Sequence, residues 1–166
     1  MRLFALLLIL APISPLASPG RTMAQDARWK EIVVLRSTRA DVERIMGKAE
    51  EHALIVYYPL KEGSLQIEYS DGVCKTGQYR AWSVPEGTVI EVVYNPFKNP
   101  PSFSSLKLDL TKFRIVRESP DVPDLLTHIQ DDKGIAYTIE PDGELHDIRY
   151  FPPSRYDHLR CSKVGK

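Results

Sequence analysis

The sequence predicts an α+β fold, in which six to seven mostly antiparallel strands form a sheet and one short helix, residues 38–46, packs on one face. Two observations lead to this prediction. One stretch combines helical spacing with a start signal and a stop signal. Most of the chain after it alternates apolar and polar residues in short runs between turn residues.

The predicted helix is bounded by its own sequence. Thr38 is a good N-cap, and Asp41 stands three residues later, where the acid of a capping box is found. Val42 and Ile45 fall at helical spacing on one face. Gly47 stands where a helix often ends in left-handed backbone. A helix this short is marginal by itself, so its apolar face is expected to pack on the strands.

The other elements are predicted from turn residues and from period-two alternation. Residues 33–36, VVLR, are expected to form an extended lead-in to the helix, and Trp29 is expected to be a core or edge-covering aromatic. Residues 95–105 contain three prolines and are expected to have no regular structure, and a short helical turn is expected at 106–112. Residues 141–143, Pro-Asp-Gly, give a strong hairpin signal. The predicted strands are residues 53–58, 65–69, 88–94, 113–117, 125–130, 135–140 and 145–151.

Residues 1–24 have the composition of a cleaved secretory signal peptide. A basic start, Met1–Arg2, precedes an apolar run over residues 3–13, and small residues follow it. The run is shorter than the about 20 apolar residues of a bilayer span, so we expect no transmembrane segment after signal cleavage. The protein is therefore expected to be exported, either periplasmic or extracellular.

The remaining residues, 25–166, are expected to form a single α+β domain, because about 140 residues suffice for one core. A weak echo suggests two repeated halves, residues 25–97 and residues 103–166. With residues 1–24 removed, 20 basic and 22 acidic residues remain, and neither sign forms a block. Nucleic acid is therefore not an expected partner.

Cys74 and Cys161 are the only cysteines in the sequence. Two cysteines in an exported chain most often form one disulfide, which here would tie the middle of the chain to its C-terminal end. Two free thiols are an alternative. A redox or nucleophilic thiol is a further alternative, although the pair lacks the CxxC spacing.

Signals for catalysis and for metal binding are sparse. The four histidines occur in no spacing typical of a metal site, and His146 is expected to be a half-buried strand residue. Glu68 and Glu91 lie on predicted strands, on faces expected to be solvated. We therefore predict no catalytic residue, no metal ligand and no cofactor. Enzyme activity stays open, with a non-catalytic role favoured.

Aromatic residues supply the candidate binding site. Tyr79, Arg80 and Trp82 are close in sequence, and Phe97 and Phe103 flank the proline-rich segment. Aromatic side chains and arginine in loops are typical of protein interfaces. The alternative is that the tryptophan and the phenylalanines only cap the ends of the core. A sheet with one helix also leaves an edge or a face that a partner strand could use.

Two sets of residues resemble known proteins. The run TRADVERIMG, residues 38–47, followed by strands, resembles a segment of the small outer-membrane assembly lipoproteins of the SmpA/BamE type. Those lipoproteins share with the beta-lactamase-inhibitor-protein-like fold a helical layer on an antiparallel sheet. The motifs STRADVER, IEYSDGVC, GIAY and IRYFPPS resemble a group of uncharacterised exported bacterial proteins. That wider resemblance implies export and no particular activity.

These observations predict a non-catalytic exported binding or assembly module whose partner is another protein of the cell envelope. One alternative is a secreted protein inhibitor or ligand carrier. Another is a small periplasmic hydrolase or metal-binding protein. The sequence identifies neither the partner nor the oligomeric state.

Overall fold

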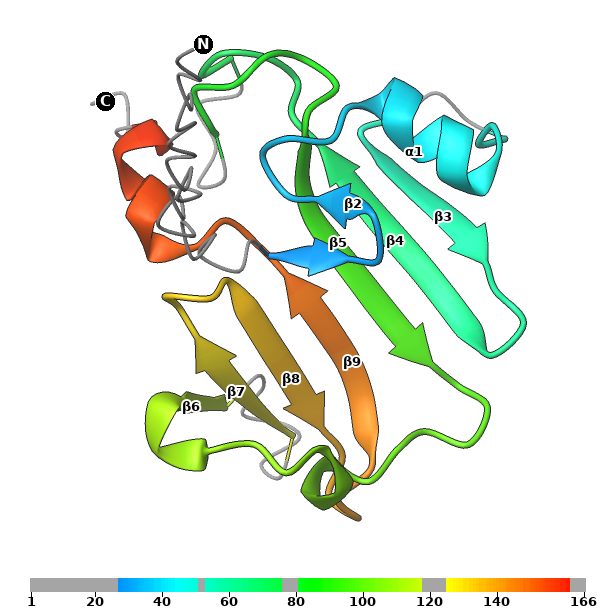
Figure 1. Cartoon of the computed structure of the whole chain (residues 1–166), viewed down its shortest axis with the longest axis vertical. Coiled ribbons are helices and arrows are strands. Elements are labelled where there is room, and N and C mark those ends of the chain that lie inside the picture. The colour runs from blue at the N-terminus through cyan, green and yellow to red at the C-terminus, as the bar shows by residue number, and fades with distance from the viewer. Residues whose placement is uncertain (1–26, 51–52, 76–80, 118–124, 162–166) are drawn as a thin grey trace, which may run out of the picture.

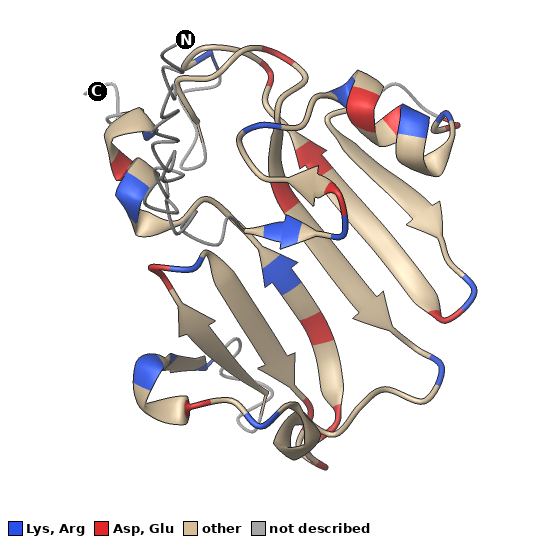
Figure 2. Ribbon diagram, in the orientation of Figure 1, with Lys and Arg blue, Asp and Glu red and all other residues tan. Residues whose placement is uncertain are grey.

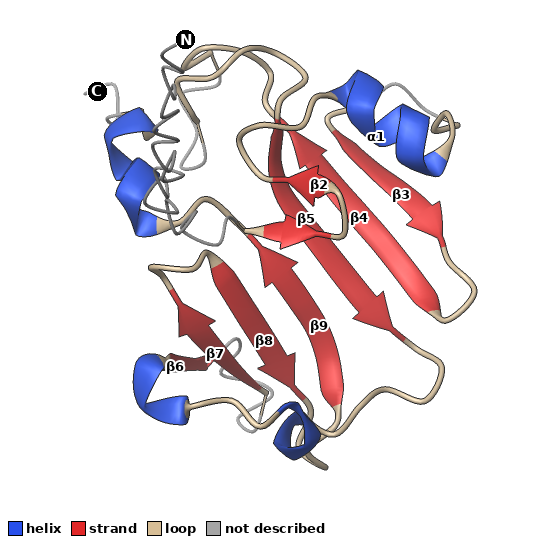
Figure 3. Cartoon of the chain, in the orientation of Figure 1, coloured by secondary structure: helices blue, strands red, loops and turns tan. Residues whose placement is uncertain are grey.

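The computed structural model describes residues 27–50, 53–75, 81–117 and 125–161, so the predicted signal peptide lies outside the described residues. Within these ranges a seven-stranded antiparallel sheet forms the body of the molecule, and helix α1 and a two-stranded hairpin lie beside it (Figure 1 and Figure 3). The predicted α+β class is confirmed. The large sheet, in spatial order, consists of β3 (Ile55–Pro59), β4 (Gly63–Tyr69), β5 (Val89–Pro96), β9 (Leu145–Tyr150), β8 (Ile135–Ile139), β7 (Leu126–Gln130) and β6 (Arg114–Arg117).

Helix α1 spans Arg39–Met46 and starts as its sequence predicts. The Thr38 hydroxyl accepts a hydrogen bond from the Asp41 N–H at 3.3 Å, and the Asp41 carboxylate accepts from the Thr38 N–H at 2.9 Å. These two bonds form a capping box. Gly47 follows with a φ of +88°, which takes the chain out of the helix. Val42, on the inner face, has no solvent exposure.

The seven predicted strands are all present, and their order joins two groups. Strands β3 to β5 form one antiparallel meander and β6 to β9 form another. The two meanders join where β5 pairs with β9, through only three registered residue pairs. The last strand of the chain therefore lies in the middle of the sheet, and the sheet is continuous across both predicted halves.

The main core lies between the first meander and its cover of α1 and the hairpin. The hairpin consists of β1 (Arg28–Trp29) and β2 (Ile32–Val33), and the sequence did not predict it. The extended lead-in expected at 33–36 is wrong beyond Val33, because residues 34–36 form a turn. Trp29 is buried, as predicted. The buried residues of this core are Ala27, Trp29, Ile32, Val34, Val42, Val56, Tyr58, Leu65, Ile67, Tyr69, Val89 and Val92.

The second meander buries a polar row on one of its faces. The Thr127 and Thr138 hydroxyls are hydrogen-bonded at 3.0 Å, and the Thr138 hydroxyl donates to the Asp147 carboxylate at 3.1 Å. The Arg149 Nε also donates to that carboxylate, at 3.2 Å. The threonines and Asp147 are all buried. Because neighbouring residues on a strand point to opposite faces, the apolar residues between them face the other way.

In the part of the chain that the structure describes, three short 3₁₀ elements connect and follow the strands. η1 (Phe103–Leu106) begins inside segment 95–105, two residues after the last of its prolines, and β5 ends inside the same segment at Pro96. The expectation that this segment is irregular is therefore wrong at both of its ends. η2 (Leu110–Lys112) lies within the predicted helical turn. η3 (Ser154–Leu159) follows β9 and was not predicted. Helical elements of three to six residues carry little periodicity, so η1 and η3 were missed and η2 was predicted only as part of a longer segment.

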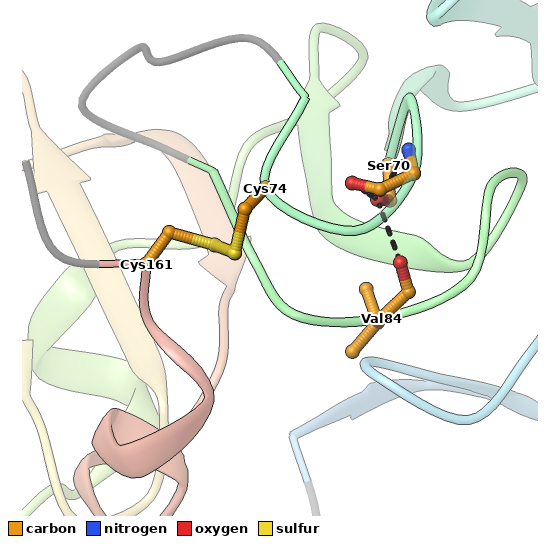
Figure 4. Close-up of a disulfide and its surroundings, with 5 residues drawn as sticks. Ser70, Cys74, Val84 and Cys161 are labelled. Atoms are coloured by element: carbon orange, nitrogen blue, oxygen red, sulfur yellow. Dashed lines mark hydrogen bonds between the residues drawn. A yellow bond between two sulfur atoms is a disulfide. The ribbon is translucent and has the colours of Figure 1, made fainter. Parts of the chain in front are cut away.

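A disulfide joins Cys74 to Cys161, as the sequence predicts, so neither cysteine is free (Figure 4). The two residues are 87 positions apart, with a Cα–Cα distance of 5.7 Å. Backbone bonds hold the same two segments together: the Cys161 N–H donates to the Ala81 carbonyl at 3.0 Å, and the Ser83 N–H donates to the Leu159 carbonyl at 2.7 Å. The C-terminal segment is therefore fixed to the chain around residue 82. Nearby, the buried Ser70 hydroxyl donates to the Val84 carbonyl at 3.5 Å.

Candidate functional site

Trp82, one of the predicted binding residues, lies in a small second core. It is buried with Val84 and Ile90, and residues of η3 pack against this cluster. The guanidinium carbon of Arg160 lies 4.9 Å from the centre of the Trp82 ring. Trp82 therefore caps an end of the core, which was the alternative reading of its role. Tyr79 and Arg80 lie outside the described residues.

Phe97 and Phe103 lie elsewhere, and in different environments. Phe97 follows β5 and is 61% exposed. Phe103 begins η1, and its ring centre lies 4.7 Å from that of His128 and 6.0 Å from that of Tyr137. β5 separates Trp82, which packs near the start of this strand, from Phe97 at its end, a span of about 25 Å at the usual rise per strand residue. The structure therefore does not bring the three described residues together into one site.

A groove over strands β7 to β9 is lined by residues that the sequence analysis did not assign to a site. It has a volume of about 530 Å³ and lies between the hairpin and strands β7 to β9. Its lining residues are Ala27, Arg28, Lys30, Gln130, Lys133, Ile135, Tyr137 and Tyr150. The apolar side chains on its floor belong to the face opposite the buried threonine row, and they are only half-buried. The alternation in 135–140 and 145–151 places Tyr137 and Tyr150 on one face of the sheet, so it could have revealed the floor of the groove. It could not have shown that cationic side chains from the hairpin and from the β7–β8 turn lie beside them.

Three cationic side chains line the groove. Arg28 and Lys30 come from the hairpin and Lys133 from the turn between β7 and β8, and Figure 2 shows basic residues in both segments. No carboxylate lines the groove. Among the described residues none of the three forms an ion pair, although the Lys30 ammonium lies 4.4 Å from the centre of the Trp29 ring. The groove therefore carries positive charge that the described chain does not neutralise.

The two tyrosines of the groove keep their hydroxyl protons at physiological pH. Burial raises the pKa of Tyr137. Burial, with smaller contributions from Tyr137 and Tyr94, raises the pKa of Tyr150 to about 12. Neither hydroxyl is hydrogen-bonded to another residue in the part of the chain that the structure describes. Both are therefore available as donors to a ligand.

An aromatic cluster lies beside the groove, on the same face of the sheet. His128 pairs with Tyr137 across β7 and β8, and the rings of Phe103 and Phe113 pack on both. His128 is buried, and its Nδ1 has no hydrogen-bond partner among the residues that the structure describes. Desolvation therefore lowers the pKa of His128, which favours the neutral ring over the charged one.

This histidine makes stability sensitive to mild acid. Below the unfolded-state pKa of 6.5, the unfolded chain binds a proton that the folded chain does not bind. The free energy of unfolding therefore decreases as the pH is lowered. We expect the free energy of unfolding to decrease from about pH 6.5 downward by at most about 1.4 kcal/mol per pH unit. In His128→Phe this part of the decrease should be absent, with stability raised by about 1 kcal/mol near pH 7 because a buried unpaired nitrogen is removed.

Urea unfolding at a series of pH values measures this effect. Hydrogen bonds from Thr38 and from Arg114 lower the pKa of Asp41 and that of Asp131, respectively. The stability that these two carboxylates contribute is therefore lost only below about pH 4, which separates it from the effect of His128. His158→Phe, at an exposed histidine outside the cluster, should keep the wild-type profile. Equal acid sensitivity in His128→Phe and in the wild type would contradict the assignment.

Three further residues differ from their predicted environments. His146 is exposed rather than half-buried, because it stands at the start of β9, and its Nδ1 lies 2.6 Å from a Glu140 carboxylate oxygen. Glu68 and Glu91 were expected on solvated faces. They are half-buried and directly opposite each other on β4 and β5, and they line a hollow of about 170 Å³ with Trp82 and Arg160. The alternation of apolar and polar residues predicted which face of the sheet carries the two glutamates. It did not predict that Trp82 and Arg160 lie on the same face.

The outer edge of the sheet at β3 is a second candidate surface. Among the described residues, β3 pairs only with β4. Ile55 and Tyr57 project from it and are 42% and 66% exposed. A hollow of about 600 Å³ lies between this strand and the segment that ends α1, lined in part by Met46 and Ala49. An exposed apolar edge strand of this kind is a template for pairing with another chain.

The described ranges contain neither a metal-binding cluster nor a membrane-spanning helix. No three His, Cys, Asp or Glu side chains there lie close enough together to hold a metal ion. No helix in those ranges is both long enough and apolar enough to cross a membrane.

Fold and surfaces together define a disulfide-closed α+β protein with an uncharged sheet edge at β3 and a cationic groove that has a tyrosine floor. Comparison with protein-family models finds no match, and comparisons with curated proteins and with solved structures find no similar protein. The resemblances noted in the sequence therefore stay predictions.

Proposed function

We propose that this protein is an exported, non-catalytic binding module of the cell envelope, and that β3 binds an extended segment of another envelope protein as an additional strand. The observation that carries this proposal is the unpaired outer edge of β3 with its exposed apolar side chains, Ile55 and Tyr57. Strand addition takes affinity from main-chain hydrogen bonds and specificity from the alternate side chains. The edge of β3 offers both.

The hydrogen-bond ladder identifies which backbone groups are available. The Leu60 N–H donates to the Gly63 carbonyl at 3.0 Å, and the Tyr69 N–H donates to the Leu54 carbonyl at 2.8 Å. Inward-bonded and outward-facing residues alternate along an antiparallel strand. The backbone N–H and C=O groups of Ile55 and Tyr57 therefore point away from β4, toward a partner strand.

The two edges of the sheet differ in charge. β6, at the opposite edge, has arginine at each end, and Arg114 is paired with Asp131 at 2.5 Å. Charged residues on an edge discourage pairing with another strand. β3 contains no charged residue, and only Pro59, at its end, lacks an N–H. The β3 edge is thus the less protected of the two.

Support for export comes from two sources. Residues 1–24 have the composition of a signal peptide, and a disulfide is typical of exported proteins. Of the alternative functions, the ligand carrier is favoured by a specific observation, the cationic groove.

Photocrosslinking in the native host tests strand addition. A benzophenone amino acid at position 55 is expected to capture one partner protein. Tyr57→Pro should reduce the adduct about tenfold or more, because it removes an outward N–H while leaving the bonds to β4 in place. Tyr57→Thr, the matched control, removes the same ring but keeps the N–H, and most of the adduct should remain.

Thermal unfolding of each variant checks that the fold is kept. Persistence of the adduct in Tyr57→Pro would contradict strand addition, as would equal capture by the crosslinker at Ile115 on the opposite edge. An adduct made of two copies of this chain would replace the proposed partner with self-association.

A further inference from the structure

We infer that the groove under the hairpin binds a small amphipathic carboxylate, with its carboxylate among Arg28, Lys30 and Lys133 and its apolar body on Tyr137 and Tyr150. This inference stands independently of strand addition at β3, because it uses a different part of the sheet and different residues.

The size of the groove suits a small ligand. Its volume of about 530 Å³ lies within the range of about 300–1,000 Å³ that is common for small-molecule sites. Tyr137, Tyr150 and Ile135 form an apolar floor that is half-buried in the described chain. The same strands bury their polar threonine row on the other face, so the apolar face is the one left open. Exposed apolar surface of this kind marks binding grooves.

Charge complementarity selects an anion. Three of the eight lining residues are cationic and none is acidic. Asp131, which precedes Lys133 in the turn, already accepts two hydrogen bonds from the Arg114 guanidinium, at 2.5 and 3.0 Å. The cationic side chains of the groove therefore have no carboxylate partner among the described residues, and a ligand carboxylate can supply one.

Strand register gives the groove a polar end and an apolar end. Gln130, Ile135 and Tyr150 are neighbours across β7, β8 and β9, next to the turn that carries Lys133. Tyr137 lies two residues further from that turn on the same face of β8, and the Phe103 and Phe113 rings lie 6.0 and 5.9 Å from its ring. A ligand with a charged head and an aromatic body matches this order.

The hydroxyl groups of Tyr137 and Tyr150 can fix the orientation of a ligand in the groove. Both phenols stay protonated, and neither is hydrogen-bonded within the described chain. Each can donate to a carboxylate or to another acceptor on the ligand. A buried polar donor of this kind favours ligands that carry an acceptor over purely apolar ones.

Calorimetric titration of the oxidised protein with 2-naphthoate tests the inference, with 2-naphthamide as a neutral ligand of the same shape. We expect 2-naphthoate to bind about tenfold or more tightly than the amide, and to weaken as salt rises from about 0.05 M to about 0.5 M. Acetate and inorganic phosphate, which lack the apolar body, should bind more weakly than 2-naphthoate.

Charge reversal in the groove locates the site. Lys133→Glu is expected to weaken 2-naphthoate binding about tenfold or more, whereas Lys61→Glu, in the distant and exposed β3–β4 turn, should leave it unchanged. Equal binding of naphthoate and naphthamide would overturn the inference, as would no binding of naphthoate or no effect of Lys133→Glu. If phosphate binds as tightly as naphthoate, the apolar floor contributes nothing to binding, and the inference of an amphipathic ligand is wrong. Because these variants leave β3 unchanged, failure here is distinguishable from failure of strand addition.

Discussion

Replacing both Cys74 and Cys161 with serine is expected to lower the free energy of unfolding by about 4–5 kcal/mol. The bridge closes a segment of 87 residues, and its loss returns the conformational freedom of that long loop to the unfolded chain. The bridge also fixes the C-terminal segment, where Tyr156 and Leu159 pack on the cluster of Trp82. Without it, η3 is expected to separate from this cluster before the sheet unfolds.

Equilibrium unfolding in urea measures the loss, with tryptophan fluorescence reporting on Trp29 in the main core and on Trp82 beside η3. The wild-type protein unfolded in the presence of a reductant is the matched control, and it should lose a similar amount. A decrease smaller than about 1 kcal/mol in both samples would contradict the expectation. It would mean that the unfolded chain is already compact around these residues.

Replacing Gly134 with alanine is expected to destabilise the protein by about 3 kcal/mol. Gly134 ends the β7–β8 turn with a φ of +65°, and its carbonyl accepts a hydrogen bond from the Phe151 N–H at 2.9 Å. A Cβ here would meet the Phe151 carbonyl oxygen well inside van der Waals contact and the Pro153 nitrogen at 2.8 Å. Both atoms belong to backbone, so the chain after β9 would have to move.

Gly143→Ala is the matched control for this substitution. Gly143 also ends a turn between strands and has a φ of +87°, but a Cβ there would meet no atom within 4 Å. The free energy of unfolding of the control should therefore decrease by only about 1–2 kcal/mol, the cost of placing alanine in left-handed backbone. Urea unfolding of both variants gives the comparison. Equal losses would show that the contact with the chain after β9 has no energetic consequence.

Helix α1 and the seven strands follow from the sequence because their signals are local. Thr38 and Asp41 are three residues apart, and the bonds that start the helix form between them. The strands alternate with period two, and their turns contain glycine, proline or aspartate. The disulfide also followed, because an exported chain with two cysteines has one pairing.

The candidate sites did not follow from the sequence in the same way. Trp82 and Phe103 were grouped by residue type, yet one lies in a small core near η3 and the other packs on His128. The groove combines the hairpin, the β7–β8 turn and two strands, which are far apart in sequence. A grouping by type and short spacing cannot detect such a site.

The sequence by itself determined helix α1, the seven strands of the large sheet with their boundaries within a few residues, and the cysteine pairing. It did so because caps, turns and alternation act over a few residues, and because two cysteines allow one bridge. Only the tertiary structure decided that β9 lies between β5 and β8, that His128 is buried while His146 is exposed, and that β3 is left as an open edge. Alternation gives each strand two faces. Which face is covered, and which strands stay at the edges, depends on packing between segments that are distant along the chain.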